Sequence, residues 1–116
     1  TDYAAAQEAL SVSLAGEQAA RPDLFGGYYR QQFELLLRNH PRPRTDGPIQ
    51  ITLTRIAPRR LDDDNLASGF KATRDGVADW LGIDDGAKRL EWRYAQRKGR
   101  PGQLGAEVVV MWWLNV

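Results

Sequence analysis

The chain has 116 residues, which is enough for one domain with its own core and excludes a large multidomain enzyme. It contains no cysteine and a single histidine, His40, so disulfides, thiolate zinc sites and cysteine nucleophiles are excluded. Any metal would therefore be bound by carboxylates. The 16 lysines and arginines nearly balance the 15 aspartates and glutamates, and the net charge of +1 taken alone argues against a strongly basic nucleic-acid binder.

The first part of the sequence predicts helices. Residues 3–14 are rich in alanine, which favours a helix. A second helix is predicted over 29–37, where apolar residues recur at helical spacing, and it stops before Pro41. We therefore expect an N-terminal helical extension over residues 1–27 and a main domain over residues 28–116, which together form one compact unit.

A loop and a strand follow these helices. Residues 40–48 contain three prolines and a glycine, which is typical of an extended loop. Residues 49–54 alternate apolar and polar side chains and are rich in β-branched residues, which predicts a strand with one buried face. Residues 66–81 return to helical spacing, and Gly82 is a suitable C-terminal stop.

Two strands are predicted at the end of the chain. Residues 90–95 alternate apolar and polar side chains, and residues 108–114 form a continuous apolar run suited to a buried strand. The connecting loop contains three glycines, so we expect the two strands to be antiparallel neighbours. The whole order predicts an α+β domain with a small mixed or antiparallel sheet and helices packed on one face.

Membrane and export signals are missing from the sequence. No apolar run approaches the roughly 20 residues that a membrane span needs. Residues 1–3 lack the basic and apolar regions of a signal peptide. We therefore expect no membrane partner and a cytoplasmic location.

The charge is unevenly distributed along the chain. Residues 30–60 hold seven basic and two acidic residues, residues 62–85 hold seven acidic and two basic residues, and residues 86–100 hold six basic residues and one acidic residue. An acidic block between two basic blocks suits a protein that binds cations at one place and a polyanion around it. The plainer alternative is a solvated surface on which opposite charges neutralise one another.

The acidic block contains a candidate metal site. If residues 62–64 are extended, Asp62 and Asp64 point to the same side at a separation of about 6.5 Å. Carboxylate oxygens suit Mg²⁺ or Mn²⁺. The structural alternative is that one aspartate caps the helix that begins near Asn65.

The helix that follows adds a lysine to this set. Asp64, Ser68, Lys71 and Asp75 are spaced so that they share one helix face, from which Lys71 would stabilise charge on a phosphate. The alternative for Lys71 is an ion pair with Asp75. At the far end of the helix, we expect the pair Asp84 and Asp85 to return towards Asp64.

These residues match a known pattern. The run Asp62-x-Asp64-Asn65, a helix with Lys71-x-x-x-Asp75, and then Asp84-Asp85 resembles the RusA-like Holliday-junction resolvases, a phage-associated group of Mg²⁺-dependent endonucleases. The resemblance covers roughly residues 49–112. It implies a RusA-like fold and a homodimer that cuts branched DNA by metal-activated water, with Mg²⁺, or Mn²⁺, as the cofactor.

The resemblance also implies roles for individual residues. Asp62, Asp64 and Asp85 are the expected metal ligands, and these three residues together with Lys71 form the expected catalytic set. Asp63, Asp75 and Asp84 are the expected supporting carboxylates.

Other basic residues are candidates for contacts to DNA phosphates, which give affinity and salt dependence with little sequence choice. They are Arg42, Arg44, Arg59, Arg60, Arg93, Arg97, Lys98 and Arg100. Two alternatives to the nuclease remain open. One is a non-catalytic phage DNA-binding protein that keeps the acidic loop for metal-linked stability, and the other is a small assembly protein that uses strand 108–114 as its contact surface.

Overall fold

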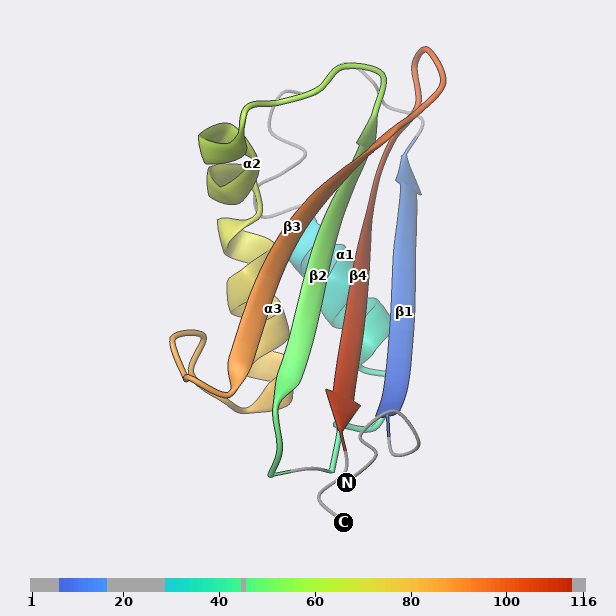
Figure 1. The fold of residues 1–116 in the computed structure, drawn as a ribbon. Helices are drawn as coiled ribbons and strands as arrows, with labels where there is room; N and C mark the ends of the chain where they lie inside the picture. The colour runs from blue at the N-terminus through green and yellow to red at the C-terminus, as the bar shows by residue number, and fades with distance from the viewer. Residues whose placement is uncertain (1–6, 17–28, 45, 114–116) are drawn as a thin grey trace.

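The computed structural model describes residues 7–16, 29–44 and 46–113. Within these ranges, a four-stranded mixed sheet carries helices on one face (Figure 1). In chain order the elements are β1 (Gln7–Gly16), α1 (Tyr29–Leu37), β2 (Ile49–Ala57), α2 (Asp63–Gly69), α3 (Lys71–Leu81), β3 (Leu90–Lys98) and β4 (Leu104–Trp113). This confirms the α+β class with a mixed sheet and helices on one face.

The strands lie in the order β1-β4-β2-β3. β4 pairs antiparallel with both β1 and β2, whereas β2 and β3 are parallel and are connected through α2 and α3. The parallel register sets Ile49 opposite Leu90 and Ala57 opposite Lys98. Strands β2 and β3 therefore end at the same edge of the sheet, and the loops that follow them start side by side.

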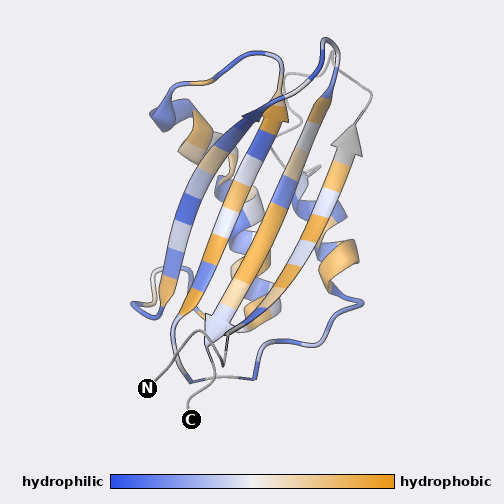
Figure 2. Cartoon of the chain, turned by 45° about the vertical axis from the view of Figure 1, so that its right-hand side comes forward, coloured by the Kyte–Doolittle hydropathy of each residue, from blue (hydrophilic) through white to orange (hydrophobic). Residues whose placement is uncertain are grey.

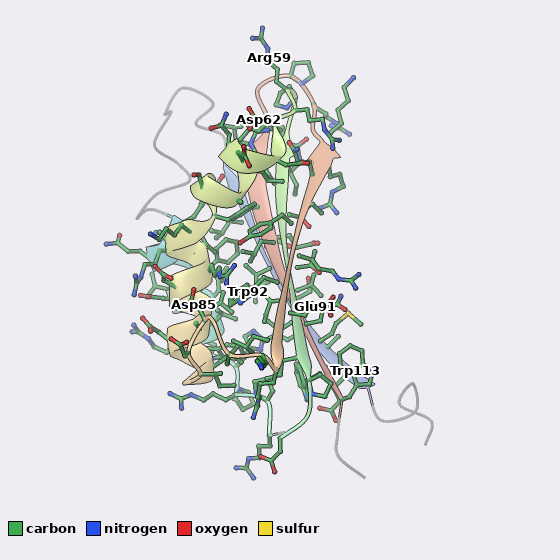
Figure 3. The ribbon with its side chains drawn as sticks, turned by 60° about the vertical axis from the view of Figure 1, so that its left-hand side comes forward. Arg59, Asp62, Asp85, Glu91, Trp92 and Trp113 are labelled. Atoms are coloured by element: carbon green, nitrogen blue, oxygen red, sulfur yellow. The ribbon has the colours of Figure 1, made fainter. Side chains whose placement is uncertain are left out.

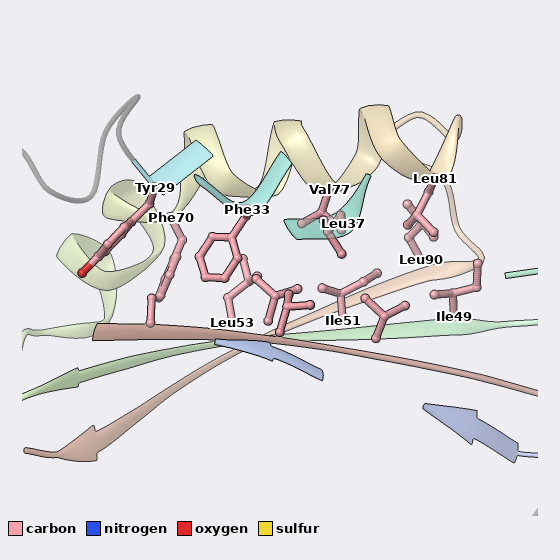
Figure 4. Close-up of a cluster of buried hydrophobic side chains, with 14 of the residues drawn as sticks. Tyr29, Phe33, Leu37, Ile49, Ile51, Leu53, Phe70, Val77, Leu81 and Leu90 are labelled. Atoms are coloured by element: carbon pink, nitrogen blue, oxygen red, sulfur yellow. The ribbon is translucent and has the colours of Figure 1, made fainter. Parts of the chain in front are cut away.

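The core lies between the helices and the sheet (Figure 4). Ile51 and Leu53 of β2 are fully buried, and Phe33 of α1 and Phe70, between α2 and α3, pack above the sheet with at most 1% exposure. Because β2 alternates buried and less buried positions, its apolar residues face the helices as the period-two pattern predicted. Burial of these side chains fixes α1 and the segment that joins α2 to α3 against the sheet.

The prediction of a helix over residues 3–14 is wrong for its described part, because residues 7–16 form the edge strand β1. Residues 3–6 lie outside the described residues. In β1, Val12 is buried and Leu10 and Leu14 pack against the core, while the serines between them are exposed. This alternation was present in the sequence, and strand pairing with β4 outweighed the helix propensity of alanine. Residues 7–16 are thus part of the main sheet, not of a helical extension.

The predicted pairing of the last two strands is also wrong, because β4 lies between β1 and β2 and not beside β3. The side chains explain the difference. β3 carries exposed Glu91, Arg93 and Arg97, which suit a sheet edge, whereas β4 is apolar along most of its length and suits the interior of the sheet. Figure 2 shows hydrophilic colour along β3 and apolar colour in β4.

The segment expected to form one helix over residues 66–81 is divided into α2 and α3. The break falls at Phe70, whose backbone (φ −89°, ψ 1°) leaves the helical region while its side chain is buried in the core. Glycine at position 69, a weak helix former, precedes the break. Of the residues expected on one face, Asp64 and Ser68 lie in α2 whereas Lys71 and Asp75 lie in α3.

None of the helices that the structure describes is long and apolar enough to cross a membrane.

Gly82 ends α3 as predicted. Its backbone is left-handed (φ 70°, ψ 26°), and its N–H donates to carbonyls of the last helical turn. We expect Gly82→Ala to lower the free energy of unfolding in urea by about 1 kcal/mol, because a Cβ disfavours this conformation. Gly82→Asn is the matched control and should lose less, because asparagine adopts this region more readily. Equal losses in the two variants would contradict the assigned role of the backbone.

Candidate functional site

The acidic turn, residues 62–65, forms the start of α2 instead of an extended segment. Asp62 is the N-cap: its Oδ1 accepts from the Asn65 backbone N–H and its Oδ2 accepts from Asn65 Nδ2, both at 2.8 Å. Asp63 and Asp64 occupy the first helical turn and are exposed. The three carboxylates therefore surround the N-terminus of α2. The expected alternation of Asp62 and Asp64 along a strand is not observed. The capping alternative is correct for Asp62.

The loop before the acidic turn is fixed to the sheet by two side chains. Gln96 of β3 accepts from the Leu61 N–H at 2.9 Å and donates to the Leu61 carbonyl at 2.7 Å. Arg55 of β2, directly opposite Gln96 in the parallel register, donates to the Arg59 carbonyl. Because Asp62 follows Leu61 directly, these contacts set the position of the acidic turn relative to β2 and β3.

Beside this loop lies a cavity of about 310 Å³, which we call the basic pocket. Five cationic residues line it: Arg55, Arg59, Arg60, Arg97 and Lys98. The neutral Gln96 also lines it. It sits where the parallel strands β2 and β3 end, and the carboxyl ends of parallel strands commonly form binding sites. Figure 3 shows Arg59 and Asp62 at this same end of the molecule. Burial lowers the pKa of the Arg55 guanidinium.

Asp85 lies elsewhere, beside α3 and next to Trp92 (Figure 3). Its Oδ2 is 3.3 Å from Arg74 Nε, and its carbonyl accepts from Arg74 Nη2 at 3.2 Å and from Trp92 Nε1 at 2.8 Å. Arg74 also donates to the Tyr94 hydroxyl and stacks over the Trp92 ring. This network attaches the loop after α3 to β3.

The carboxylates expected to converge do not do so in the part of the chain that the structure describes, where no group of three or more metal-binding side chains is found. Lys71 is exposed at the first residue of α3, one helical turn before Arg74. Asp75 contributes, after Glu34 and Asp79, to raising the pKa of Arg30. Asp84 accepts from the Gly86 N–H in the loop that holds Asp85. The role of Asp85 as a metal ligand stays a prediction.

The remaining basic candidates are spread over the molecule. Arg100 lies in the loop after β3, at the same end as the basic pocket. Arg93 lies within β3 and makes two hydrogen bonds to Glu91. Arg42 and Arg44 lie in the loop before β2, at the opposite end of a strand about 26 Å long, where they line a second cavity of about 840 Å³.

Sequence reasoning missed Gln96, Arg55 and Arg74 as organising residues. A glutamine or arginine at an inward-facing position of a strand must find polar partners, and this was the available signal for Gln96 and Arg55. The position of Arg74 in α3 did not reveal that its side chain contacts Asp85 and Trp92.

The contacts of Gln96 generate a prediction. Gln96→Met removes both hydrogen bonds to Leu61 at similar volume, and we expect a loss of about 2 kcal/mol in the free energy of unfolding. Gln50→Met, the same change on the half-buried outer face of β2, is the control and should cost clearly less. Urea denaturation measures both, and equal losses would show that the Leu61 contacts contribute little.

Comparison with known proteins does not assign the chain to a family. No family model matches the chain. An uncharacterized protein of Xylella fastidiosa is 45% identical over 42 residues, which are 34% of this chain and 28% of that protein.

Among solved structures, thiamine monophosphate kinase from Aquifex aeolicus superposes with a TM-score of 0.50 at 8% identity, over 90% of this chain and 32% of the kinase. The corresponding kinase from Stenotrophomonas maltophilia gives 0.44 at 13% identity, over 96% of this chain and 32% of that chain. The chain thus spans about a third of these kinases, and the likeness concerns the fold alone.

Proposed function

We propose that the protein is a Mg²⁺-dependent endodeoxyribonuclease of the RusA-like type that cleaves branched DNA. The observation that carries the proposal is the position of the acidic turn beside the basic pocket, where β2 and β3 end. A phosphodiester nuclease needs oxygen ligands for a cation next to groups that bind the DNA backbone. The residue pattern from Asp62 to Asp85 supports the same class.

The carboxylates of the acidic turn suit a hard cation that takes few of its ligands from the protein. Mg²⁺ is usually bound through one or two carboxylates, with water and substrate phosphates at its other positions. Asp62 and Asp64 would hold it, Asp62 through the lone pairs that its two hydrogen bonds from Asn65 leave unused, and DNA phosphate and water would complete its ligands. When bound, the cation would supply a water of lowered pKa as the nucleophile and would polarise the scissile phosphate.

The other residues of the chain would bind and orient the substrate. Arg59 and Arg60, exposed before the acidic turn, would bind backbone phosphates. Lys71, exposed at the start of α3, would offset negative charge that develops on the phosphate oxygens. Asp85 would act as a metal ligand only if Arg74 released its carboxylate.

The assembly and location follow the same proposal. A homodimer would present two acidic turns and so cut two strands of a branched substrate. We place this activity in the cytoplasm, where DNA is accessible, with no membrane partner.

The proposal predicts metal-dependent cleavage of a synthetic four-way junction. Asp64→Asn should reduce the cleavage rate about 100-fold or more, because a metal-binding carboxylate is lost. Asp46→Asn, an exposed aspartate in the loop before β2, is the control and should cleave as the wild type does. Denaturing gels with Mg²⁺, with Mn²⁺ and with EDTA measure the products. Absence of wild-type cleavage with both metals, or undiminished cleavage by Asp64→Asn, would contradict the proposal.

One observation favours a second candidate, a non-catalytic DNA-binding protein. Both carboxylate oxygens of Asp62 cap α2 and the Asp85 carboxylate pairs with Arg74, so two of the three expected ligands already have structural roles. This candidate predicts junction binding without cleavage in the same assay. An assembly role for β4 would have to use its open face, because both edges of β4 are paired.

A further inference from the structure

The basic pocket is the more strongly charged of the two cavities described above. Four arginines and one lysine line about 310 Å³, and none of its lining residues is acidic. Cations gathered around one cavity repel one another, and a bound anion relieves that repulsion. The volume is at the small end of ligand pockets, which suits a small group and not an extended ligand.

Arg55 distinguishes this pocket from a patch of surface arginines. It lies on β2, it is partly buried, and its guanidinium is oriented by donation to the Arg59 carbonyl. Burial disfavours its charged form and lowers its pKa, and a nearby anion would offset this cost. A rigid guanidinium offers several N–H donors in a plane, a geometry that matches phosphate oxygens.

Of the five cations, Arg97 already has a carboxylate partner. Arg97 Nη2 lies 3.8 Å from Glu107 Oε2, a long and partly exposed ion pair. The acidic turn follows the loop that carries Arg59 and Arg60, but the Asp62 carboxylate is directed to Asn65. The loop itself is fixed by Gln96, which holds the pocket wall in place before any ligand arrives.

We propose that the basic pocket binds one phosphate group, with Arg55 as its inner wall and Arg59, Arg60 and Lys98 around its opening. For DNA this rests on and deepens the proposed function, which already gives Arg59 and Arg60 to backbone phosphates. The new element is one pocket with Arg55 at its inner wall, which would bind phosphate whether or not DNA is cut. The phosphate has two possible sources, a DNA backbone or a free phosphate, and both present the same oxygens to the guanidinium groups.

The test removes two charges at the opening of the pocket and leaves Arg55, which also supports the loop. The pocket variant is Arg60→Gln with Lys98→Gln. The matched control is Arg38→Gln with Lys88→Gln, two exposed positions outside every proposed site and with the same loss of charge. Thermal unfolding followed by circular dichroism checks that both variants fold. All binding is measured in EDTA, so that cleavage does not enter the result.

In one arm, fluorescence anisotropy measures the affinity for a labelled duplex between 50 and 200 mM salt, an interval over which phosphate contacts dominate. We expect the pocket variant to bind about tenfold more weakly than the control, and the slope of log K against log salt to fall by about 2. In the other arm, inorganic phosphate is titrated while the Gln96 side-chain amide is followed by NMR. The wild type and the control should show a saturable shift that the pocket variant loses.

Loss in both arms, or in either arm alone, supports the pocket, and the arm affected identifies the source of the phosphate. If the pocket variant and the control agree within twofold for DNA and show the same phosphate titration, the proposal is overturned. Failure of the nuclease proposal is a separate result, because it would appear as intact binding without Mg²⁺-dependent cleavage.

Discussion

Parallel pairing of β2 with β3 is the constraint on which the rest of the structure depends. Because the two strands run in the same direction, the chain must return through α2 and α3, and those helices cover the core face of the sheet. The same pairing makes both strands end at one edge. The loop with Arg59 and Arg60 and the strand end with Arg97 and Lys98 are thereby brought together from positions almost 40 residues apart.

Contacts between side chains and backbone then turn this edge into a defined site. Gln96 and Arg55 stand opposite each other on the two strands, and each holds a backbone group of the loop before α2. The acidic turn starts immediately after the loop and is closed by the two hydrogen bonds that Asn65 donates to the Asp62 carboxylate. These contacts hold the acidic turn and the loop in place, which under the proposed function would reduce the entropy lost on binding a DNA backbone.

The sequence predicted the elements that repeat a clear period. β2, β3 and α1 were identified from alternating or helical apolar spacing, and Gly82 from its position after α3. The errors arose where contacts between distant parts of the chain outweighed local conformational preference. β1 has alanines that favour a helix, but pairing with β4 decides its conformation. The strand order also depends on which strands can lie at the edges of the sheet, and this is a property of the whole sheet.

The candidate site was predicted in its composition but not in its geometry. Asp62 and Asp64 were identified together, yet the start of α2 one turn earlier than expected changed the directions of their side chains. Asp85 was expected beside them, and instead the Arg74 and Trp92 contacts hold it next to α3. Arg74 and Trp92 lie 11 and 7 residues from Asp85 and belong to α3 and β3, so helical or alternating spacing along the chain carried no information about these contacts.

The central claim is that a divalent cation binds at the acidic turn, next to the basic pocket. Paramagnetic Mn²⁺ titrated into ¹⁵N-labelled protein tests it directly, because the ion broadens NMR signals of nearby nuclei. The account predicts selective broadening of the backbone amides of residues 61–65 and of the Gln96 side-chain amide, with the Trp92 indole N–H beside Asp85 much less affected. Uniform broadening, or broadening centred on Asp84, Asp85 and Trp92, would contradict it.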